Sequence, residues 1–119
     1  MLLKTKHKQL DVWKISAELV TLIYKLTTDF PKIEIYGLIS QIRRAAISIP
    51  SNIAEGASRT TPAERKRFYS IARASLVEAD TQLEIAKNLG YCTEDILKDV
   101  GEKINHTFAM LSNLISKTN

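Results

Sequence analysis

Apolar residues recur at helical spacing through residues 11–28, at i, i+3, i+4 and i+7, which predicts an amphipathic helix. Its expected core face consists of Trp13, Ala17, Val20, Ile23, Tyr24 and Thr27. A second apolar stripe lies beside that face and consists of Ile15, Leu19, Leu22 and Leu26. Because an outer helix of a monomeric bundle needs only one apolar face, we expect the second stripe to contact another copy of the chain. A helix embedded deeply in the monomer is the alternative.

A second helix is expected from about residue 33 to residue 57, because Phe30-Pro31 ends the first one. Pro50 lies inside the pattern and predicts a kink rather than a stop. The expected core face consists of Ile35, Leu38, Ile39, Ile42, Ala45, Ala46, Ile49 and Ile53. A polar stripe borders it and consists of Gln41, Arg44, Ser48, Asn52 and Glu55. Because unpaired polar burial is costly, we expect a hydrogen-bonded network here, with Arg44 or Arg59 facing Glu55 or Glu78.

The third helix has a clear start, because Thr61-Pro62-Ala63-Glu64 is a capping box with proline at the first helical position. Gly90 is the expected residue just past its end, and Thr93 is the expected N-cap of a fourth helix. The core positions expected on the third helix are Phe68, Ile71, Ala72, Ser75, Leu76, Ala79, Leu83, Ala86 and Leu89. Those on the fourth helix are Val100, Ile104, Phe108, Leu111, Leu114 and Ile115.

Four helices joined by three short connections predict an all-α fold, an antiparallel up-down-up-down four-helix bundle. We expect residues 10–119 to form this single domain and residues 1–9 to form a flexible basic arm. The single cysteine, Cys92, rules out an intramolecular disulfide and suits the cytoplasm. No apolar run approaches the ~20 residues of a membrane span, so we expect no membrane partner.

Charge is distributed unevenly behind a formal net charge of +4. Residues 41–73 hold all six arginines, and residues 74–102 set two lysines against seven acidic side chains. Cations in the first turns of the third helix oppose the helix dipole, which favours a bound anion there. The candidate nucleic-acid contacts are Arg43, Arg59, Arg65, Lys66, Arg67 and Arg73. Ion pairs to an acidic stretch of the same or another chain, or a solvated face, are the alternatives.

Catalytic chemistry has little support in the sequence. The only histidines are His7 and His106, and neither has the glutamate partner of a di-iron bundle site, so we expect no metal and no cofactor. Cys92 fits a small apolar plug better than a nucleophile. There is no phosphate-binding loop and no dinucleotide fingerprint. We therefore expect a protein that is not an enzyme.

The segment Gln-Ile-Arg-Arg-Ala-Ala-Ile-Ser-Ile-Pro-Ser-Asn-Ile-Ala-Glu-Gly at residues 41–56 resembles the hallmark of the 23S ribosomal RNA intervening-sequence family. Leu-Asp-Val-Trp-Lys at residues 10–14, Phe-Pro at 30–31, Tyr-Gly-Leu at 36–38 and Ser-Leu-Val-Glu at 75–78 agree with it in the same order. Ala74 departs from the glycine usual before that Ser-Leu pair. The resemblance extends from about Leu10 to Ile115.

This resemblance implies an antiparallel four-helix bundle that assembles into a homopentamer. A related branch, the accessory variability protein of diversity-generating retroelements, binds nucleic acid and a reverse transcriptase. We therefore expect a non-enzymatic homo-oligomer that binds RNA or DNA through its clustered arginines and lysines, with a reverse transcriptase as partner if a retroelement encodes it. The alternative is a structural or protein-interaction module whose basic residues contact subunits or partners.

Overall fold

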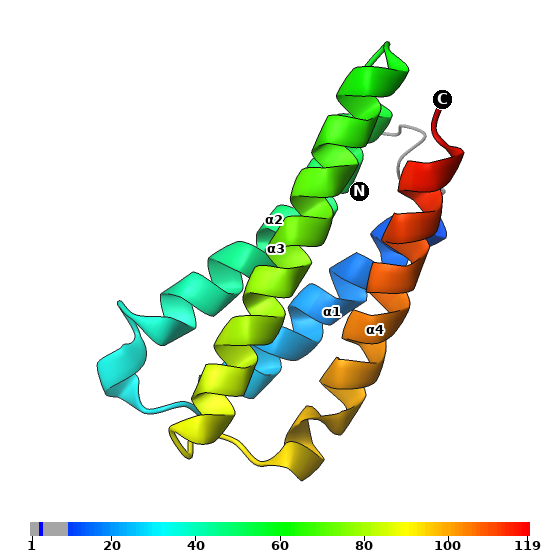
Figure 1. Cartoon of the computed structure of the whole chain (residues 1–119). Coiled ribbons are helices and arrows are strands. Elements are labelled where there is room, and N and C mark those ends of the chain that lie inside the picture. The colour runs from blue at the N-terminus through cyan, green and yellow to red at the C-terminus, as the bar shows by residue number, and fades with distance from the viewer. Residues whose placement is uncertain (1–2, 4–9) are drawn as a thin grey trace.

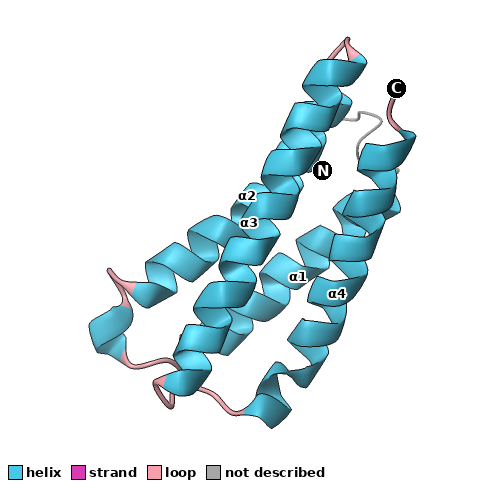
Figure 2. Cartoon of the chain, in the orientation of Figure 1, coloured by secondary structure: helices cyan, strands magenta, loops and turns pink. Residues whose placement is uncertain are grey.

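The computed structural model describes Leu3 and residues 10–119, and all the regular structure in this part is helical (Figures 1 and 2). The elements are α1 (Asp11–Thr28), the short 3-10 helix η2 (Lys32–Glu34), α2 (Leu38–Ala57), α3 (Pro62–Asn88) and α4 (Glu94–Lys117). This confirms the all-α, four-helix fold. The arm predicted at residues 1–9 lies outside the described residues, except for Leu3. No helix of the described part is both long and apolar enough to cross a membrane.

The four long helices pack as neighbours around one core. Helix α2 packs on α1 and α3, and α4 packs on the other sides of α3 and α1. Figure 1 shows the chain reversing direction at each connection, so that sequential helices run antiparallel. Helices α2 and α3 form a long hairpin whose connection, residues 58–61, projects past the ends of α1 and α4 (Figure 1).

The second helix begins later than its apolar pattern predicts, at Leu38 instead of about residue 33. The carboxylate of Glu34 accepts hydrogen bonds from the Leu38 backbone N–H at 3.2 Å and from the Tyr91 hydroxyl at 2.7 Å. The bond from Tyr91 holds the pKa of Glu34 below its usual value, and the same bond raises the pKa of Tyr91. Glu34 thus ties η2 to the start of α2 and to the α3–α4 connection. Ile35, predicted in the core, is 53% exposed in this segment.

The predicted helix ends are confirmed by their hydrogen bonds. Thr61 accepts a bond from the Glu64 N–H, and Thr93 accepts one from the Ile96 N–H, both at 3.2 Å. Gly90 has a φ of 82°, a conformation that glycine adopts without strain. The Tyr91 N–H bonds the Ala86 carbonyl and the Gly90 N–H bonds the Lys87 carbonyl, which is the Schellman pattern. Helix α2 continues through Pro50, as the sequence predicts.

The buried face of α1 is centred between the two stripes expected from its sequence. Its buried positions are Val12, Ser16, Leu19, Ile23 and Thr27. Leu19 is 0% exposed within one chain, so its prediction as an oligomer contact is wrong. The other predicted contacts, Ile15, Leu22 and Leu26, are half-buried, and Leu22 and Leu26 pack against the core. The two stripes are flanks of one broad face, because α1 is wedged between α2 and α4.

Buried hydroxyl groups complete the core by bonding to their own helices. Ser16 donates to the Trp13 carbonyl, Thr27 to the Ile23 carbonyl and Thr107 to the Lys103 carbonyl, at 2.7–2.8 Å. These bonds allow polar residues at core positions. The apolar pattern missed Thr107 and Tyr69, which are buried, and wrongly predicted a core position for Ile71, Leu89 and Phe108, which are exposed.

Cys92 lies in the apolar core, at the connection between α3 and α4. Burial raises the pKa of its thiol above the usual value. A buried thiol with a raised pKa is a poor nucleophile, which agrees with the interpretation of Cys92 as an apolar plug.

Candidate nucleic-acid interface

Four of the predicted basic contacts meet where α2 turns into α3. We call residues 55–68 the hairpin tip; its cations are Arg59, Arg65, Lys66 and Arg67. One guanidinium nitrogen of Arg65 donates to the carbonyls of Arg59 and Thr60, at 3.1 Å each. Arg65 therefore holds the connection between the helices in place, and its charge stays at the tip.

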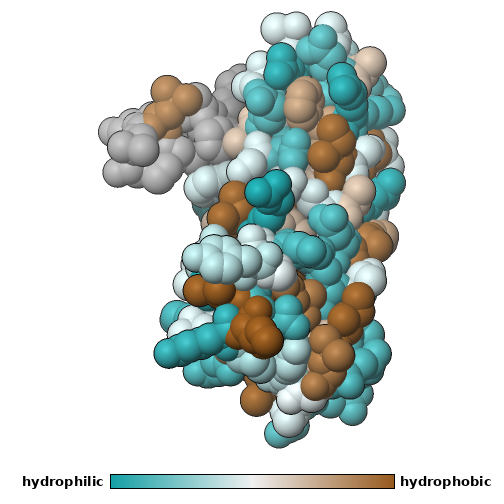
Figure 3. Space-filling model, turned by 90° about the vertical axis from the view of Figure 1, so that its left-hand side faces the viewer, coloured by the Kyte–Doolittle hydropathy of each residue, from teal (hydrophilic) through white to brown (hydrophobic). Residues whose placement is uncertain are grey.

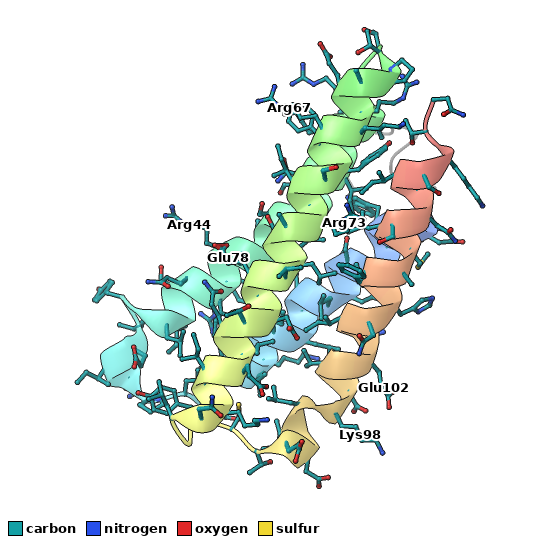
Figure 4. The ribbon with its side chains drawn as sticks, viewed as in Figure 1. Arg44, Arg67, Arg73, Glu78, Lys98 and Glu102 are labelled. Carbon is teal, nitrogen blue, oxygen red and sulfur yellow. The ribbon has the colours of Figure 1, made fainter. Side chains whose placement is uncertain are left out.

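Phe68 organises the other arginines of the hairpin tip. The guanidinium of Arg59 lies 4.8 Å from the centre of its ring, and that of Arg67 lies 5.9 Å away. Arg59 also pairs with Glu55, at 3.4 Å. Arg67 is exposed and points away from the bundle (Figure 4). Within the described residues, the side chains of Lys66 and Arg67 form no hydrogen bond and no ion pair. Both charges are therefore available to an anion.

Arg43 does not belong to the hairpin tip. Its Nε donates to the Thr27 hydroxyl at 2.9 Å, and a terminal nitrogen donates to the Tyr24 carbonyl at 3.2 Å. The guanidinium also lies 4.5 Å from the centre of the Tyr24 ring. A cation at the last turn of α1 is favoured by the helix dipole. Arg43 thus joins α2 to α1, away from the hairpin tip, and its role as a nucleic-acid contact stays a prediction.

Arg73 is separated from the hairpin tip in the same way. It lies between α3 and α4 in Figure 4, where it donates to the Ser112 hydroxyl at 3.1 Å and lies 5.8 Å from the Phe108 ring centre. Eight residues of helix place it about 12 Å along α3 from Arg65. The six predicted contacts therefore do not form one patch: four gather at the tip, and Arg43 and Arg73 join helices.

The polar stripe of α2 forms a network only at its centre. The hydroxyls of Ser48 and Ser75 lie 2.8 Å apart, and the Asn52 amide donates to the carbonyl and the hydroxyl of Ser48, both at 2.8 Å. These hydrogen bonds join α2 to α3. The outer members of the predicted network, Gln41, Arg44, Glu55 and Glu78, are exposed. Glu55 does face Arg59, as predicted, but in a largely open pair. Sequence reasoning missed Gln82, whose side-chain oxygen is buried without a partner among the described residues.

Glu55→Ala is expected to change the free energy of unfolding by no more than about 0.5 kcal/mol. The pair with Arg59 is an i,i+4 contact whose two side chains are 40% and 49% exposed, and such pairs stabilise little. Ser75→Ala removes the partner of Ser48 across the helices and is expected to destabilise by about 0.5–1.5 kcal/mol. Urea unfolding followed by circular dichroism compares the two variants. A larger effect at Glu55 than at Ser75 would contradict this picture.

The end of the bundle opposite the hairpin tip is acidic. An open groove there, between the end of α3 and the start of α4, is lined by Glu84, Lys87, Glu94, Asp95, Lys98 and Glu102 among others. No three His, Cys, Asp or Glu side chains of the described residues come together as a metal site. The basic first half and the acidic second half of α3 therefore give the molecule a charge polarity along its length.

The family model of the 23S rRNA-intervening sequence protein matches residues 8–113, which include every element of this site. The chain belongs to that family. A crystal structure of a protein of unknown function from the S23 ribosomal protein family of Bacteroides thetaiotaomicron has a similar fold. Its TM-score is 0.79 and its sequence identity is 22%, over 89% of this chain and 99% of that one. No curated protein matches the sequence.

Proposed function

We propose that this member of the 23S rRNA-intervening sequence family is a non-enzymatic, homo-oligomeric, cytoplasmic protein that binds RNA or DNA through its hairpin tip. The observation that supports this most is the pair Lys66 and Arg67, two cations without ion-pair partners in the described part, on a projecting end of the bundle. Arg59 and Arg65 add their charge beside them. Arginine and lysine at such a surface are suited to phosphate oxygens.

Binding through this surface would depend little on sequence. The tip offers point charges and guanidinium groups, which contact phosphates and position a nucleic acid without reading bases. The acidic groove at the other end of the bundle would repel the backbone, so the nucleic acid would approach the tip end on.

Assembly would strengthen this binding. The resemblance supports a homo-oligomer, most simply a homopentamer, in which several tips contact one nucleic acid together. Lys4, Lys6 and Lys8 in the arm would add further positive charge. A reverse transcriptase would be a second partner if a retroelement encodes the chain.

One observation favours the alternative, a structural or protein-interaction module without nucleic-acid binding. Arg43, Arg59, Arg65 and Arg73 all have partners inside the chain. Four of the six arginines that suggested a polyanion site therefore have structural contacts that explain their presence.

The double variant Lys66→Ala/Arg67→Ala is expected to bind single-stranded RNA and DNA more weakly than the native protein. Each lost phosphate contact lowers the slope of log K against log salt by about 0.7–0.9, so the two substitutions lower it by about 1.4–1.8 for each hairpin tip that contacts the nucleic acid. Fluorescence anisotropy with labelled oligonucleotides across ~50–200 mM salt measures both quantities. Arg65 is kept, because it holds the α2–α3 connection.

The matched control is Lys32→Ala/Lys98→Ala, which removes the same charge from exposed positions at the other end of the bundle. This control should keep the native slope. Absence of binding by the native protein at low salt would reject the nucleic-acid function in favour of the interaction module. Equal loss in both double variants would show that net charge, and not the hairpin tip, governs binding.

A further inference from the structure

The outer side of the α2–α3 hairpin exposes apolar side chains that the core does not use. Ile71, Ile85 and Leu89 on α3 are between 38% and 55% exposed. Figure 3 looks onto this side of the molecule and shows apolar patches set among polar ones. Single exposed apolar residues are ordinary, but several along one side of a helix indicate a contact surface. We call this the hairpin face, defined by Arg44 on α2 and by Ile71, Glu78, Ile85 and Leu89 on α3.

Two opposite charges lie in the middle of the hairpin face. Arg44 and Glu78 are both exposed, and in Figure 4 both side chains lie on the left-hand side of the hairpin. Among the described residues neither has an ion pair or a side-chain hydrogen bond. The face therefore has one positive and one negative group, each without a partner in the described part of its own chain.

The two charges also lie at the same height along the hairpin. The contact between Ser48 and Ser75 sets the register of the two antiparallel helices. Arg44 precedes Ser48 by four residues and Glu78 follows Ser75 by three, which puts both on the same side of that contact and within about 2 Å in height. A neighbouring copy that keeps this height can therefore set its Glu78 against Arg44.

We propose that the hairpin face binds a second copy of this chain, with Arg44 of one copy paired with Glu78 of the next and the exposed isoleucines packed around the pair. This rests on the proposed homo-oligomer and assigns its contact surface. The charge complementarity of the face selects a second copy over an unrelated partner, because the chain itself supplies both members of the pair at matching height. A ring whose axis runs along the bundle keeps that height, and so does a two-fold pair whose axis lies in the face and runs along the bundle.

The test is a charge exchange. Arg44→Glu and Glu78→Arg each place like charges at the contact, and each is expected to weaken self-association about tenfold or more. The double variant Arg44→Glu/Glu78→Arg restores opposite charges and is expected to regain the native mass. Light scattering coupled to size-exclusion chromatography, over a concentration series, gives the mass, and circular dichroism checks that each variant is folded.

Lys98 and Glu102 supply the matched control. Both are exposed on α4, on the other side of the molecule from the hairpin face, and carry the same two charges (Figure 4). Lys98→Glu, Glu102→Lys and their combination should leave the mass unchanged. Effects of equal size in these controls would overturn the proposal.

The remaining outcomes are separable. If the native chain is a monomer throughout, the homo-oligomer itself fails, whereas nucleic-acid binding is judged independently by the salt titration. If the native chain associates but the single variants at Arg44 and Glu78 keep its mass, the hairpin face is not the interface. If the single variants dissociate and the double variant does not recover, the pairing of Arg44 with Glu78 is wrong. A change in thermal midpoint without a change in mass would assign the two charges to the single chain, which also overturns the proposal.

Discussion

Leu19→Ala is expected to lower the free energy of unfolding by about 2–5 kcal/mol, a larger loss than at any other position proposed for substitution. The side chain is 0% exposed between α2 and α4, so truncation leaves a cavity that the packed helices fill poorly. Urea unfolding followed by circular dichroism gives the difference, provided that the denaturant dependence stays close to native.

Leu22→Ala is the matched control for Leu19. Leu22 lies on the same helix and is the same residue type, but it is only half-buried at the flank of α1. We expect a clearly smaller loss of stability there. If Leu19→Ala unfolds like the native protein and instead lowers the mass of the oligomer, Leu19 would be a contact between copies, as its sequence pattern predicted, and the core position would be wrong.

The variants at Leu19 and Leu22 test what the periodicity of apolar residues can and cannot predict. The apolar pattern predicted the bounds of α1 as residues 11–28, which the structure confirms. It did not find the centre of the buried face, because apolar residues cover nearly the whole circumference of this helix. Contacts with α2 on one flank and α4 on the other decide that centre, and such contacts involve residues far away in the sequence.

The sequence predicted the helix caps better than it predicted which charged residues lie together. The caps at Thr61, Gly90 and Thr93 depend on residues within four positions, so the sequence is enough to predict them. The arginines are close in the sequence, but not all of them are close in space. The chain between Arg43 and Arg59 is mostly helical, so the two residues are about 24 Å apart. Arg43 and Arg73 bond to Thr27 and Ser112, partners that are 16 and 39 residues away and carry no local signal.

Gly56→Ala is expected to destabilise the fold by about 1–3 kcal/mol, although alanine is the better helix former. A methyl group built on Gly56 would lie 2.8 Å and 2.9 Å from ring carbons of Tyr69 and 3.1 Å from the Cβ of Phe68. The Tyr69 ring is buried, and the Cβ of Phe68 moves only with the backbone of α3. The two helices would therefore have to separate at the hairpin tip, with a cost larger than the gain in helix propensity.

Gly101→Ala is the opposite case and the matched control. Gly101 lies inside α4, and an added methyl group there meets nothing within 4 Å. Only the difference in helix propensity between glycine and alanine remains, so the free energy of unfolding of this variant should rise by up to about 1 kcal/mol. Thermal and urea unfolding give the change in stability of both variants. A gain in stability at both glycines would show that α2 and α3 tolerate the methyl group, so that close helix packing does not explain Gly56. A loss of stability at Gly56 alone would show that Gly56 is needed for the close approach of these two helices.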